Sequence, residues 1–448
     1  MTRRAIGFGT DGVRGVANEE LTAFVALKLG MAAAYVLTHH VQRAQVVVGR
    51  DTRISGDMLE GALAAGLASM GVRVQNVGIV PTPGVAYITT KMGASAGAVI
   101  SASHNPYDDN GIKFFGPDGR KLSDALEDEI ERAMRRWHRL PRPKGGQIGR
   151  VEDHPEYVDA YLAFLHTRSP FPLHGFHLVL DCANGATCSI APRVFSDLGA
   201  RITAIHTQPS GTNINLDCGS THPSSLCQTV REVGADAGLA FDGDGDRVMM
   251  CDERGEVVDG DQMMALCAIA MRQRGELSND TVVATVMSNA GLDVAMERHG
   301  IRLIRTAVGD RYVAEALEAT GAALGGEQSG HLLFPRVSRA GDGIITGLRV
   351  LAEMKRSGLR LSQLAAVMER LPQKLRNVRV HHRDGWEEGP GVREAIERAY
   401  ERLGRREWLS VRASGTEPVI RIMAQGPDAS VVDEVVDDLA SVIAAAAR

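Results

Sequence analysis

Residues 98–115, with the sequence AVISASHNPYDDNGIKFF, contain side chains that are suited to covalent chemistry. The apolar start of this stretch predicts the end of a buried strand, and Pro106 prevents that strand from continuing. Ser103 and His104 are therefore expected in a tight loop at the C-terminal end of a strand, where α/β proteins place reactive groups. Lys113 is expected on the next short strand, as a cation or a proton carrier. The alternative is a polar turn between two strands, because Ser, Asn, Pro, Asp and Gly are ordinary turn residues.

Three aspartates alternate with glycine in the sequence FDGDGDR, at Asp242, Asp244 and Asp246, between segments predicted as strands. Carboxylates at this spacing can converge on one hard divalent cation, and they would repel one another without such a counter-ion. An EF-hand ending at Glu253 is one alternative, but Arg247 stands where the sharp turn of that loop needs glycine. A turn of solvated surface charges is the other alternative. Three carboxylates and one outside oxygen would suit a Mg²⁺ site that leaves room for a substrate.

Two glycine-rich segments carry further polar side chains. In residues 325–331, GGEQSGH, Glu327 and Ser329 offer polar contacts on a flexible frame, as a polyhydroxylated ligand would need. A polar loop between a helix and a strand is the alternative there. In residues 8–15, FGTDGVRG, the glycines indicate a sharp bend or a close approach, and Arg14 could reach an anion. A simple glycine-rich turn is the alternative for this second segment.

A fourth polar loop has the sequence RASGTEP and begins at Arg412. Its guanidinium, the hydroxyls of Ser414 and Thr416, the backbone N–H of Gly415, and Arg421 on the following strand would form a local anion cradle. The loop is no Walker sequence, because it lacks the GK[ST] ending and a helix directly after it. A strand-connecting turn with incidental arginines is the alternative.

One pattern of strand, loop, helix, glycine and strand recurs at residues 45–74, 177–205 and 282–305. Three such units imply three related α/β domains with parallel or mixed sheets. After a linker at residues 371–373, a first strand at 378–382 and the elements that follow it predict a smaller C-terminal α+β domain with a mainly antiparallel sheet. We expect the active site in the central cleft, where one polar loop from each domain meets the others. The predicted domains are residues 1–155, 156–255, 256–370 and 371–448.

Composition excludes several functional classes. A net charge of −5 gives no global basic field for nucleic acid or anionic lipid, and aromatic residues make up only 4% of the chain, too few for stacking on single strands. The six cysteines show no CxxC spacing and resemble neither a zinc site nor a disulfide framework. The N-terminus lacks the apolar core of a signal peptide, and no apolar run approaches the roughly 20 residues of a membrane span. We expect a reduced, cytoplasmic protein without nucleic-acid or membrane partners.

The four motifs SASHNP, DGDGDR, GEQSGH and RASGTEP, in this order, resemble those of the α-D-phosphohexomutase superfamily over essentially the whole chain. Finer features are similar to one branch, the bacterial phosphoglucosamine mutases: FGTDGVRG, FFGPDGRKLSD, CGSTHP, TVMSN and VGDRYV. The departures are Asp108, where many relatives have tyrosine, and Ala413, in a variable position of the last motif. Neither lies at an implied catalytic position.

The resemblance implies an isomerase that interconverts glucosamine 6-phosphate and glucosamine 1-phosphate on the route to UDP-N-acetylglucosamine. Ser103 would carry a phosphoryl group and donate it to the sugar, which gives a 1,6-bisphosphate that turns over in the cleft. Glucosamine 1,6-bisphosphate or glucose 1,6-bisphosphate would act as the activator. One Mg²⁺ would be held by Asp242, Asp244, Asp246 and a phosphate oxygen on Ser103, and such a metal would neutralise the transferring group.

The resemblance also implies roles for the remaining residues. Arg14, His104 and Arg247 would assist the transfer, and Lys113 or His331 would be the general acid or base. Glu327 and Ser329 would hold sugar hydroxyls. The C-terminal domain is expected to close over the cleft as a lid. The non-reacting phosphate would be held by Arg412, Ser414, Gly415, Thr416 and Arg421.

Several alternatives stay open at this stage. The nearest is a phosphomannomutase/phosphoglucomutase of the same superfamily, since no residue can be assigned from one sequence to recognition of the amine at C2 of the sugar. A phosphoserine-based phosphatase would use water to intercept the phosphorylated enzyme. A non-catalytic calcium-binding or scaffolding protein is the third, although Arg247 and the anion loop count against it. The expected partner is a small phosphosugar, and a homodimer is one possible assembly.

Overall fold

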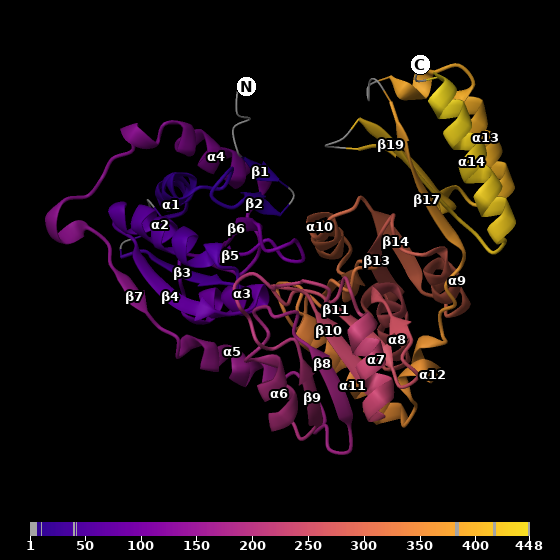
Figure 1. The fold of residues 1–448 in the computed structure, drawn as a ribbon, viewed down its shortest axis with the longest axis horizontal. Helices are drawn as coiled ribbons and strands as arrows, with labels where there is room; N and C mark the ends of the chain where they lie inside the picture. The colour runs from indigo at the N-terminus through magenta and orange to yellow at the C-terminus, as the bar shows by residue number, and fades with distance from the viewer. Residues whose placement is uncertain are drawn as a thin grey trace.

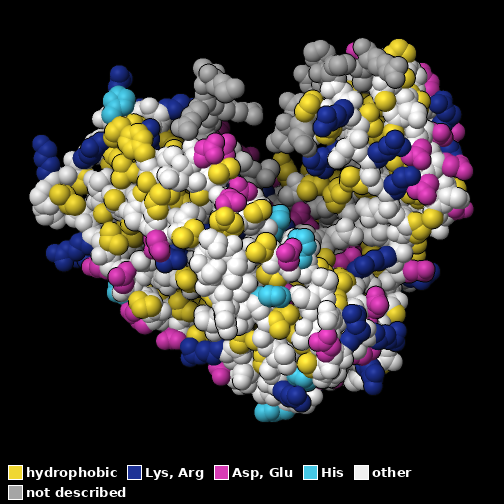
Figure 2. Space-filling model, viewed as in Figure 1, with side chains coloured by type: hydrophobic (Ala, Val, Ile, Leu, Met, Phe, Trp, Pro, Cys, Tyr) yellow, Lys and Arg dark blue, Asp and Glu magenta, His cyan; other side chains and the backbone are white. Residues whose placement is uncertain are grey.

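The computed structural model describes residues 7–9, 11–38, 41, 43–380, 385–414 and 418–446. Along these described residues, four β-sheets of seven, five, four and three strands follow one another. Figure 1 shows the first sheet at the left, the second sheet in the lower centre, the third sheet to the right of centre, and the C-terminal sheet at the upper right. The molecular surface is hollowed between the first and the last of these parts (Figure 2). No helix in the described ranges has both the length and the apolar character that crossing a bilayer requires.

The first sheet has the strand order β1-β2-β6-β5-β3-β4-β7 and is mixed. Strand β3 runs parallel to β4 and β5, whereas β6 runs antiparallel to β5 and β2. Helices α1 and α2 pack closely because Gly30 and Gly66 have no Cβ: at Gly66 a Cβ would lie 2.2 Å from a backbone oxygen of α1. The strands are β1 Phe8–Gly9, β2 Gly12–Val16, β3 Gln45–Arg50, β4 Arg73–Ile79, β5 Ala96–Ile100, β6 Asp109–Phe115 and β7 Val151–Asp153. The helices are α1 Ala23–Thr38, α2 Ser55–Ser69, α3 Thr82–Lys91 and α4 Asp124–Arg135.

The second and third sheets are also mixed, with the orders β12-β11-β10-β8-β9 and β14-β13-β15-β16. Their strands are β8 His177–Asp181, β9 Arg201–Ile205, β10 Ala237–Phe241, β11 Val248–Asp252, β12 Val257–Val258, β13 Thr281–Thr285, β14 Arg302–Thr306, β15 Leu324–Gly326 and β16 Leu332–Leu333. Their helices are α5 Tyr157–His166, α6 Ala191–Asp197, α7 Ser224–Val233, α8 Gly260–Gln273, α9 Ala290–Arg298, α10 Asp310–Thr320, α11 Gly343–Ser357 and α12 Leu361–Ala365. Short 3-10 turns are η1 Trp137–Arg139, η2 Gly145–Gln147, η3 Ser278–Asp280, η4 Trp386–Glu388 and η5 Arg406–Trp408.

The three repeated units predicted from the sequence are confirmed. They are β3–α2–β4, β8–α6–β9 and β13–α9–β14, and the two strands of each unit pair in parallel. The glycines that close the helices, Gly71, Gly199 and Gly300, all have positive φ angles. One detail differs: Ser55 at the start of α2 makes no cap, and its hydroxyl accepts a hydrogen bond from Asn110 Nδ2 at 2.8 Å instead.

The C-terminal part has the predicted antiparallel sheet, in the order β17-β19-β18. Its first strand begins earlier than expected, because Gln373 of the proposed linker already pairs with Gln425. Of the residues predicted for that strand, 381 and 382 lie outside the described ones. An apolar core of its own, separate from the cores of the other sheets, joins this sheet to its two helices. The elements are β17 Gln373–Arg379, β18 Leu409–Ala413, β19 Val419–Gln425, α13 Val392–Leu403 and α14 Ala429–Ala446.

Candidate active site

Ser103 lies in the loop between β5 and β6, as the sequence predicted, and is 1% exposed. Its φ angle is +54°, in the left-handed region that a non-glycine residue rarely adopts. Strain of this kind amounts to about 1–3 kcal/mol and persists only where the surroundings hold the backbone in place. One holding contact is local: the Ser103 N–H donates to Ser101 Oγ at 2.9 Å, and Ser101 Oγ donates to Asp51 Oδ2 at 2.6 Å.

A buried arginine provides most of the remaining support for this loop. Arg53 is 1% exposed, and its guanidinium donates to the backbone oxygens of Ser103 and Asn105, both at 2.9 Å. Asp51 accepts from Arg53 Nε at 2.9 Å, although burial still raises the pKa of the Asp51 carboxyl. Asn215 Nδ2 also donates to Ser103 O at 2.9 Å. Sequence analysis did not assign a role to Arg53. The signal that could have indicated one is the charged run RDTR at the end of an apolar strand.

The three aspartates occupy the turn between β10 and β11, which are antiparallel strands and not the helices of an EF-hand. Asp242, Asp244 and Asp246 are 0%, 1% and 5% exposed, and their ligand atoms lie within 4.8 Å of one another. Asp242 Oδ2 accepts a hydrogen bond from Ser103 Oγ at 2.6 Å. Burial, together with Asp246 and Asp244, raises the pKa of Asp242 well above its ordinary value. The negative charge of Asp242 is therefore unfavourable beside the serine. Burial also raises the pKa of Asp246, but His331, Lys113 and Arg247 outweigh it and lower the value.

The carboxylate oxygens of this triad fit a hard divalent cation. Asp244 Oδ1 and Asp246 Oδ1 are buried and have no hydrogen-bond partner among the described residues. Buried acceptors of this kind are unfavourable unless another group contacts them. Carboxylate oxygens are the ligands that Mg²⁺ and Ca²⁺ prefer. The donor set and the unfilled oxygens together favour a metal at this turn.

Two cations from the first sheet lie near the triad. Lys113, on β6 and 2% exposed, lies with its Nζ 2.9 Å from Asp244 Oδ2 and 2.9 Å from Asp11 Oδ2. Burial alone would lower the pKa of Lys113, but Asp11 and Asp244 raise it above its usual range, so the side chain is a cation. Arg14, on β2, forms an ion pair with the same Asp11. Asp11 is a second residue that sequence analysis did not assign, and it lies within the glycine-rich segment that the analysis had noted.

His104 lies between the serine and a guanidinium. Its Nδ1 is 3.3 Å from Ser103 Oγ and 3.1 Å from Arg247 Nη1. Burial, Arg247 and Arg14 lower the pKa of His104 to about 4, so the imidazole is neutral at physiological pH. A neutral imidazole can accept a proton or a hydrogen bond at this position.

The GEQSGH loop reaches the same site through His331. His331 Nδ1 lies 3.5 Å from Asp246 Oδ2; burial lowers the pKa of this histidine, but Asp246 and Asp310 outweigh it and raise the value. Glu327 Oε1 accepts from the N–H of Gly309 at 3.2 Å, at the start of α10. The Ser329 hydroxyl is buried without a hydrogen-bond partner among the described residues, which suits a group awaiting a ligand.

The anion loop is described only in part. Arg412 on β18 and Arg421 on β19 are register partners in the C-terminal sheet. Ser414 is 3% exposed, and its N–H donates to Val419 O at 2.9 Å. Gly415 and Thr416 lie outside the described residues. Ser103, His104, Arg247, Lys113, Arg14, the triad and His331 are thus brought together, whereas the assignment of this loop to a phosphate stays a prediction.

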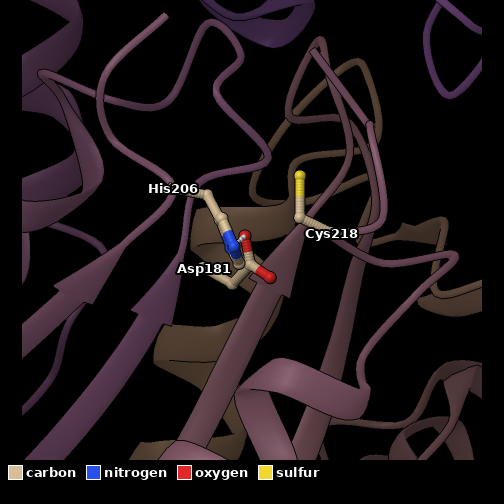
Figure 3. Close-up of side chains that lie close together, drawn as sticks. All are labelled: Asp181, His206 and Cys218. Carbon is tan, nitrogen blue, oxygen red and sulfur yellow. Dashed lines mark ion pairs between the residues drawn. The ribbon is translucent and has the colours of Figure 1, made fainter. Parts of the chain in front are cut away.

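A second group of side chains could also hold a metal. Asp181, His206 and Cys218 offer ligand atoms within 4.8 Å of one another (Figure 3). Asp181 Oδ1 pairs with His206 Nδ1 at 3.0 Å, and the Asp181 carboxylate accepts from the N–H groups of Ala183 and Gly219, both at 2.9 Å. In Figure 3 the Cys218 thiol points away from the other two side chains, and burial raises its pKa to about 12. The sequence does not reveal this group, because its members lie on separate segments.

Comparison with known proteins places the site in a family. The phosphoglucomutase/phosphomannomutase family matches four consecutive parts of the chain: alpha/beta/alpha domain I at residues 5–140, domain II at 155–255, domain III at 259–371 and the C-terminal domain at 375–442. The phosphoglucosamine mutase of Desulforamulus reducens is 52% identical over 437 residues, which cover 97% of this chain and 98% of that protein.

Two solved structures show the same architecture. A phosphoglucomutase/phosphomannomutase family protein from Burkholderia thailandensis has a TM-score of 0.83 at 25% identity, and the match covers 100% of this chain and 98% of that one. The Aspergillus fumigatus N-acetylphosphoglucosamine mutase, solved with GlcNAc-6P and magnesium, has a TM-score of 0.69 at 18% identity, covering 100% and 97%. The chain belongs to the phosphoglucomutase/phosphomannomutase family and, within it, to the phosphoglucosamine mutases.

Proposed function

We propose that this chain interconverts glucosamine 6-phosphate and glucosamine 1-phosphate through a phosphorylated Ser103 and a 1,6-bisphosphate, and so supplies UDP-N-acetylglucosamine synthesis. The observation that carries the proposal is the 2.6 Å contact of Ser103 Oγ with Asp242, inside a buried triad of aspartates that has unfilled oxygens. The 52% identity to a phosphoglucosamine mutase over almost the full chain supports the amino sugar as substrate.

The first transfer moves one phosphoryl group from enzyme to sugar. The bond from phosphorus to Ser103 Oγ breaks, and a bond forms from phosphorus to the free hydroxyl oxygen of the sugar monophosphate. The hydroxyl proton passes to a base in the site, and Ser103 Oγ regains a proton, so the products are the bisphosphate and a serine hydroxyl. The second transfer is the reverse step on the other phosphate, after the intermediate has turned over in the cleft.

The side chains near Ser103 suit this chemistry, because phosphoryl transfer depends mainly on positioning and on the neutralisation of charge. Asp242, Asp244, Asp246 and a phosphate oxygen on Ser103 would hold Mg²⁺, which when bound neutralises negative charge on the transferring group. The cationic Lys113 lies within this cluster, 2.9 Å from Asp244. The Aspergillus fumigatus relative solved with magnesium supports this choice of metal.

Further groups would move protons and orient the phosphate. Arg14, His104 and Arg247 would assist the transfer: His104 Nδ1 lies 3.3 Å from Ser103 Oγ, and both arginines act on the pKa of that imidazole. Lys113 or His331 would be the general acid or base. Arg247 Nη1 already donates to His104 at 3.1 Å, and this hydrogen bond orients the imidazole. Other N–H groups of the guanidinium would then be available to the phosphoryl oxygens.

The two remaining loops would bind the substrate in both orientations. Glu327 and Ser329 would hold sugar hydroxyls, and the Ser329 hydroxyl is suited to this because it has no hydrogen-bond partner among the described residues. Because either phosphate must occupy the distal position, the clamp has to recognise a phosphate and nothing else of the sugar. The separate apolar core of the C-terminal part supports its expected closure as a lid. The proposed clamp consists of Arg412, Ser414, Gly415, Thr416 and Arg421.

Intact-protein mass and isomerisation assays test the proposal together. Wild-type protein and Ser103→Ala are measured before and after glucose 1,6-bisphosphate, with and without Mg²⁺. We expect a phosphate-sized mass on the wild type only, and at least a thousand-fold loss of isomerisation in Ser103→Ala, as for the removal of other covalent nucleophiles. Unchanged activity in Ser103→Ala would refute the nucleophile assignment.

Substrate choice separates this function from the nearest alternative. Initial rates on glucosamine, glucose and mannose 1-phosphates, measured on one charged preparation, should be highest for glucosamine. A higher kcat/KM for mannose or glucose phosphate would favour a phosphomannomutase/phosphoglucomutase. Stoichiometric release of inorganic phosphate in place of isomer would indicate a phosphatase.

The expected setting is the cytoplasm, with a diffusing phosphosugar as the partner and a homodimer as the assembly to test. Sedimentation of the charged enzyme at several concentrations would distinguish a dimer from a monomer. The domain boundaries predicted at residues 155, 255 and 370 are tested by limited proteolysis.

A further inference from the structure

Lys121 joins acidic side chains from two different parts of the molecule. Its Nζ lies 2.5 Å from Asp11 Oδ1 and 2.5 Å from Asp310 Oδ2. Asp11 directly precedes β2 of the first sheet, whereas Asp310 is the first residue of α10, which packs on the third sheet. One ammonium group therefore links the first and third α/β parts beside the active site.

On the Asp11 side, this link is connected to the reacting groups. The other oxygen of Asp11 lies 2.9 Å from Lys113 Nζ, and Lys113 Nζ lies 2.9 Å from Asp244 Oδ2. Burial would raise the pKa of Asp11, but Lys113, Lys121 and Arg14 hold it well below its ordinary value, so the carboxylate is charged. Asp11 thus shares its two oxygens between a lysine in the site and Lys121 outside it.

On the Asp310 side, the link is connected to His331, the other candidate for proton transfer. Asp310 Oδ2 lies 3.9 Å from His331 Nε2, on the opposite side of the imidazole from Asp246. Asp310 itself is well placed at a helix N-terminus, where the helix dipole favours a negative charge. The preceding residue, Gly309, donates its N–H to Glu327 at 3.2 Å, so this end of α10 is also tied to the GEQSGH loop.

The backbone around Lys121 is fixed by a tight turn. Lys121 pairs with Phe115 as an antiparallel bridge, and the Gly116 N–H donates to Arg120 O at 2.8 Å. Gly119 has a φ of +76°, and a Cβ there would lie 2.8 Å from Ala86 O, so the turn needs glycine. The ammonium group is thus presented from a rigid hairpin, which is what a fixed link between two domains requires.

We propose that Lys121 is a positioning residue for phosphoryl transfer, and this inference rests on the proposed function. Its ammonium holds Asp11 and Asp310 together, and through these two carboxylates it fixes Lys113 and His331 beside the metal loop. Without the cation, two half-buried carboxylates would face each other and separate or take up protons. A displacement of about 1 Å in a catalytic group can lower a rate about a hundred-fold.

The neighbouring residue provides a matched control. Arg120 also forms an ion pair across the interface with α10, at 2.9 Å from Glu318 Oε2. These side chains are 44% and 67% exposed, and no ion pair or side-chain hydrogen bond among the described residues joins Arg120 to a residue of the site. If Lys121 acted only by stabilising the interface with α10, the Arg120 and Lys121 variants would lose activity alike. A positioning role predicts a loss of activity in the Lys121 variant only.

The test uses the full-length enzyme with the variants Lys121→Met, Lys121→Arg and Arg120→Met. Lys121 and Asp310 line a cavity of about 490 Å³, which gives a larger guanidinium room to bridge the two carboxylates. The measurements are kcat and KM for isomerisation, the rate at which glucose 1,6-bisphosphate charges Ser103 by intact mass, and the melting temperature. We expect Lys121→Met to lower kcat and the charging rate about 10-fold to 100-fold, the range for groups that orient active-site ligands. KM should change little, whereas the melting temperature should fall because two carboxylates lose their shared cation. Lys121→Arg should recover most of kcat and of the melting temperature, and Arg120→Met should match the wild type.

Three outcomes would overturn the inference. They are a kcat within threefold of the wild type in Lys121→Met, an equal loss in Arg120→Met, and a loss that Lys121→Arg does not recover at all. A wild type that isomerises glucose or mannose phosphate in place of glucosamine phosphate would refute the proposed substrate only, and the Lys121 variants would then be compared on that sugar. A wild type that neither isomerises any of these sugars nor charges Ser103 would refute both proposals.

Discussion

Among the residues that the structure describes, two groups of side chains could each hold a metal ion, and they differ in how many of their oxygens already accept hydrogen bonds. Asp242, Asp244 and Asp246 place three buried carboxylates in one turn, and two of their oxygens have no hydrogen-bond partner among the described residues. In the other group, the carboxylate of Asp181 accepts from two backbone N–H groups and lies 3.0 Å from His206 Nδ1.

The difference shows that ligand identity alone is a weak sign of a metal site. The second group has an aspartate, a histidine and a cysteine, which are common zinc ligands. Yet its one negative charge is already balanced by hydrogen bonds, which fits a structural role. In the triad, the charge of Asp242 is unfavourable, and two acceptors near a strained serine have no hydrogen-bond partner among the described residues, so a cation would stabilise it. The predictions below test this contrast.

The largest expected effect is on catalysis. Asp242→Asn keeps the shape of the side chain and removes one ligand charge beside Ser103, so isomerisation should fall about 100-fold to 1000-fold, as expected where a metal supplies several kcal/mol of charge stabilisation. Cys218→Ser, in the second group, should stay within twofold of the wild type. Steady-state kcat across a Mg²⁺ titration measures both. Comparable losses in the two variants would remove the distinction between the groups.

Metal binding to the folded protein should be visible without turnover. At a Mg²⁺ concentration one hundred times the dissociation constant, the wild type should gain about 2.7 kcal/mol of stability. Asp242→Asn should lose most of this gain, and Cys218→Ser should keep all of it. Chemical unfolding with Mg²⁺ and with EDTA gives the difference directly. A gain that depends on Cys218 would relocate the metal to the second group.

The sequence predicts those parts of the fold and site that depend on neighbouring residues. The residues of each strand–helix–glycine–strand unit are contiguous in the sequence, and so are those of the loop that carries Ser103. The aspartates were assigned to a metal because all three lie in one turn, and their unfilled oxygens support that assignment.

Contacts between distant segments could not be read in the same way. Arg53 supports the serine loop from a segment far earlier in the chain, and nothing near it marks the carbonyl oxygens it contacts. Lys121 is an ordinary surface-type residue until α10 brings Asp310 to it. The pairing of Asp181 with His206 likewise exists only after two parallel strands have aligned. The polar network is therefore a property of the tertiary structure.

Stability without metal should respond in opposite directions in the two groups. Asp181→Asn removes the charge that binds His206 and weakens the acceptors of two buried N–H groups, so it should destabilise the protein by about 2 kcal/mol. Asp242→Asn should stabilise the metal-free protein by about 1 kcal/mol, since the raised pKa of Asp242 means that its charged form is unfavourable in the fold. Urea unfolding in EDTA at pH near 8 measures both. Destabilisation by both variants would show that the triad is internally balanced as well.

The smallest expected effect is the pH dependence of the second group. The hydrogen bond to Asp181 raises the pKa of His206 against the opposing influence of burial. A histidine whose pKa is higher in the folded state stabilises the protein fully below its unfolded value, and this contribution disappears as the pH rises through the folded value. His206→Gln should therefore lower stability by about 1 kcal/mol at about pH 5.5 and hardly at all at about pH 9, because the imidazole is partly exposed and its ion pair is screened. The comparison is made in EDTA, where a metal cannot contribute. A bound metal would give the reverse dependence, because neutral histidine is the form that ligates and binding strengthens as the pH rises. The sign of the slope, more than its size, thus decides whether Asp181 and His206 form an ion pair or a metal site.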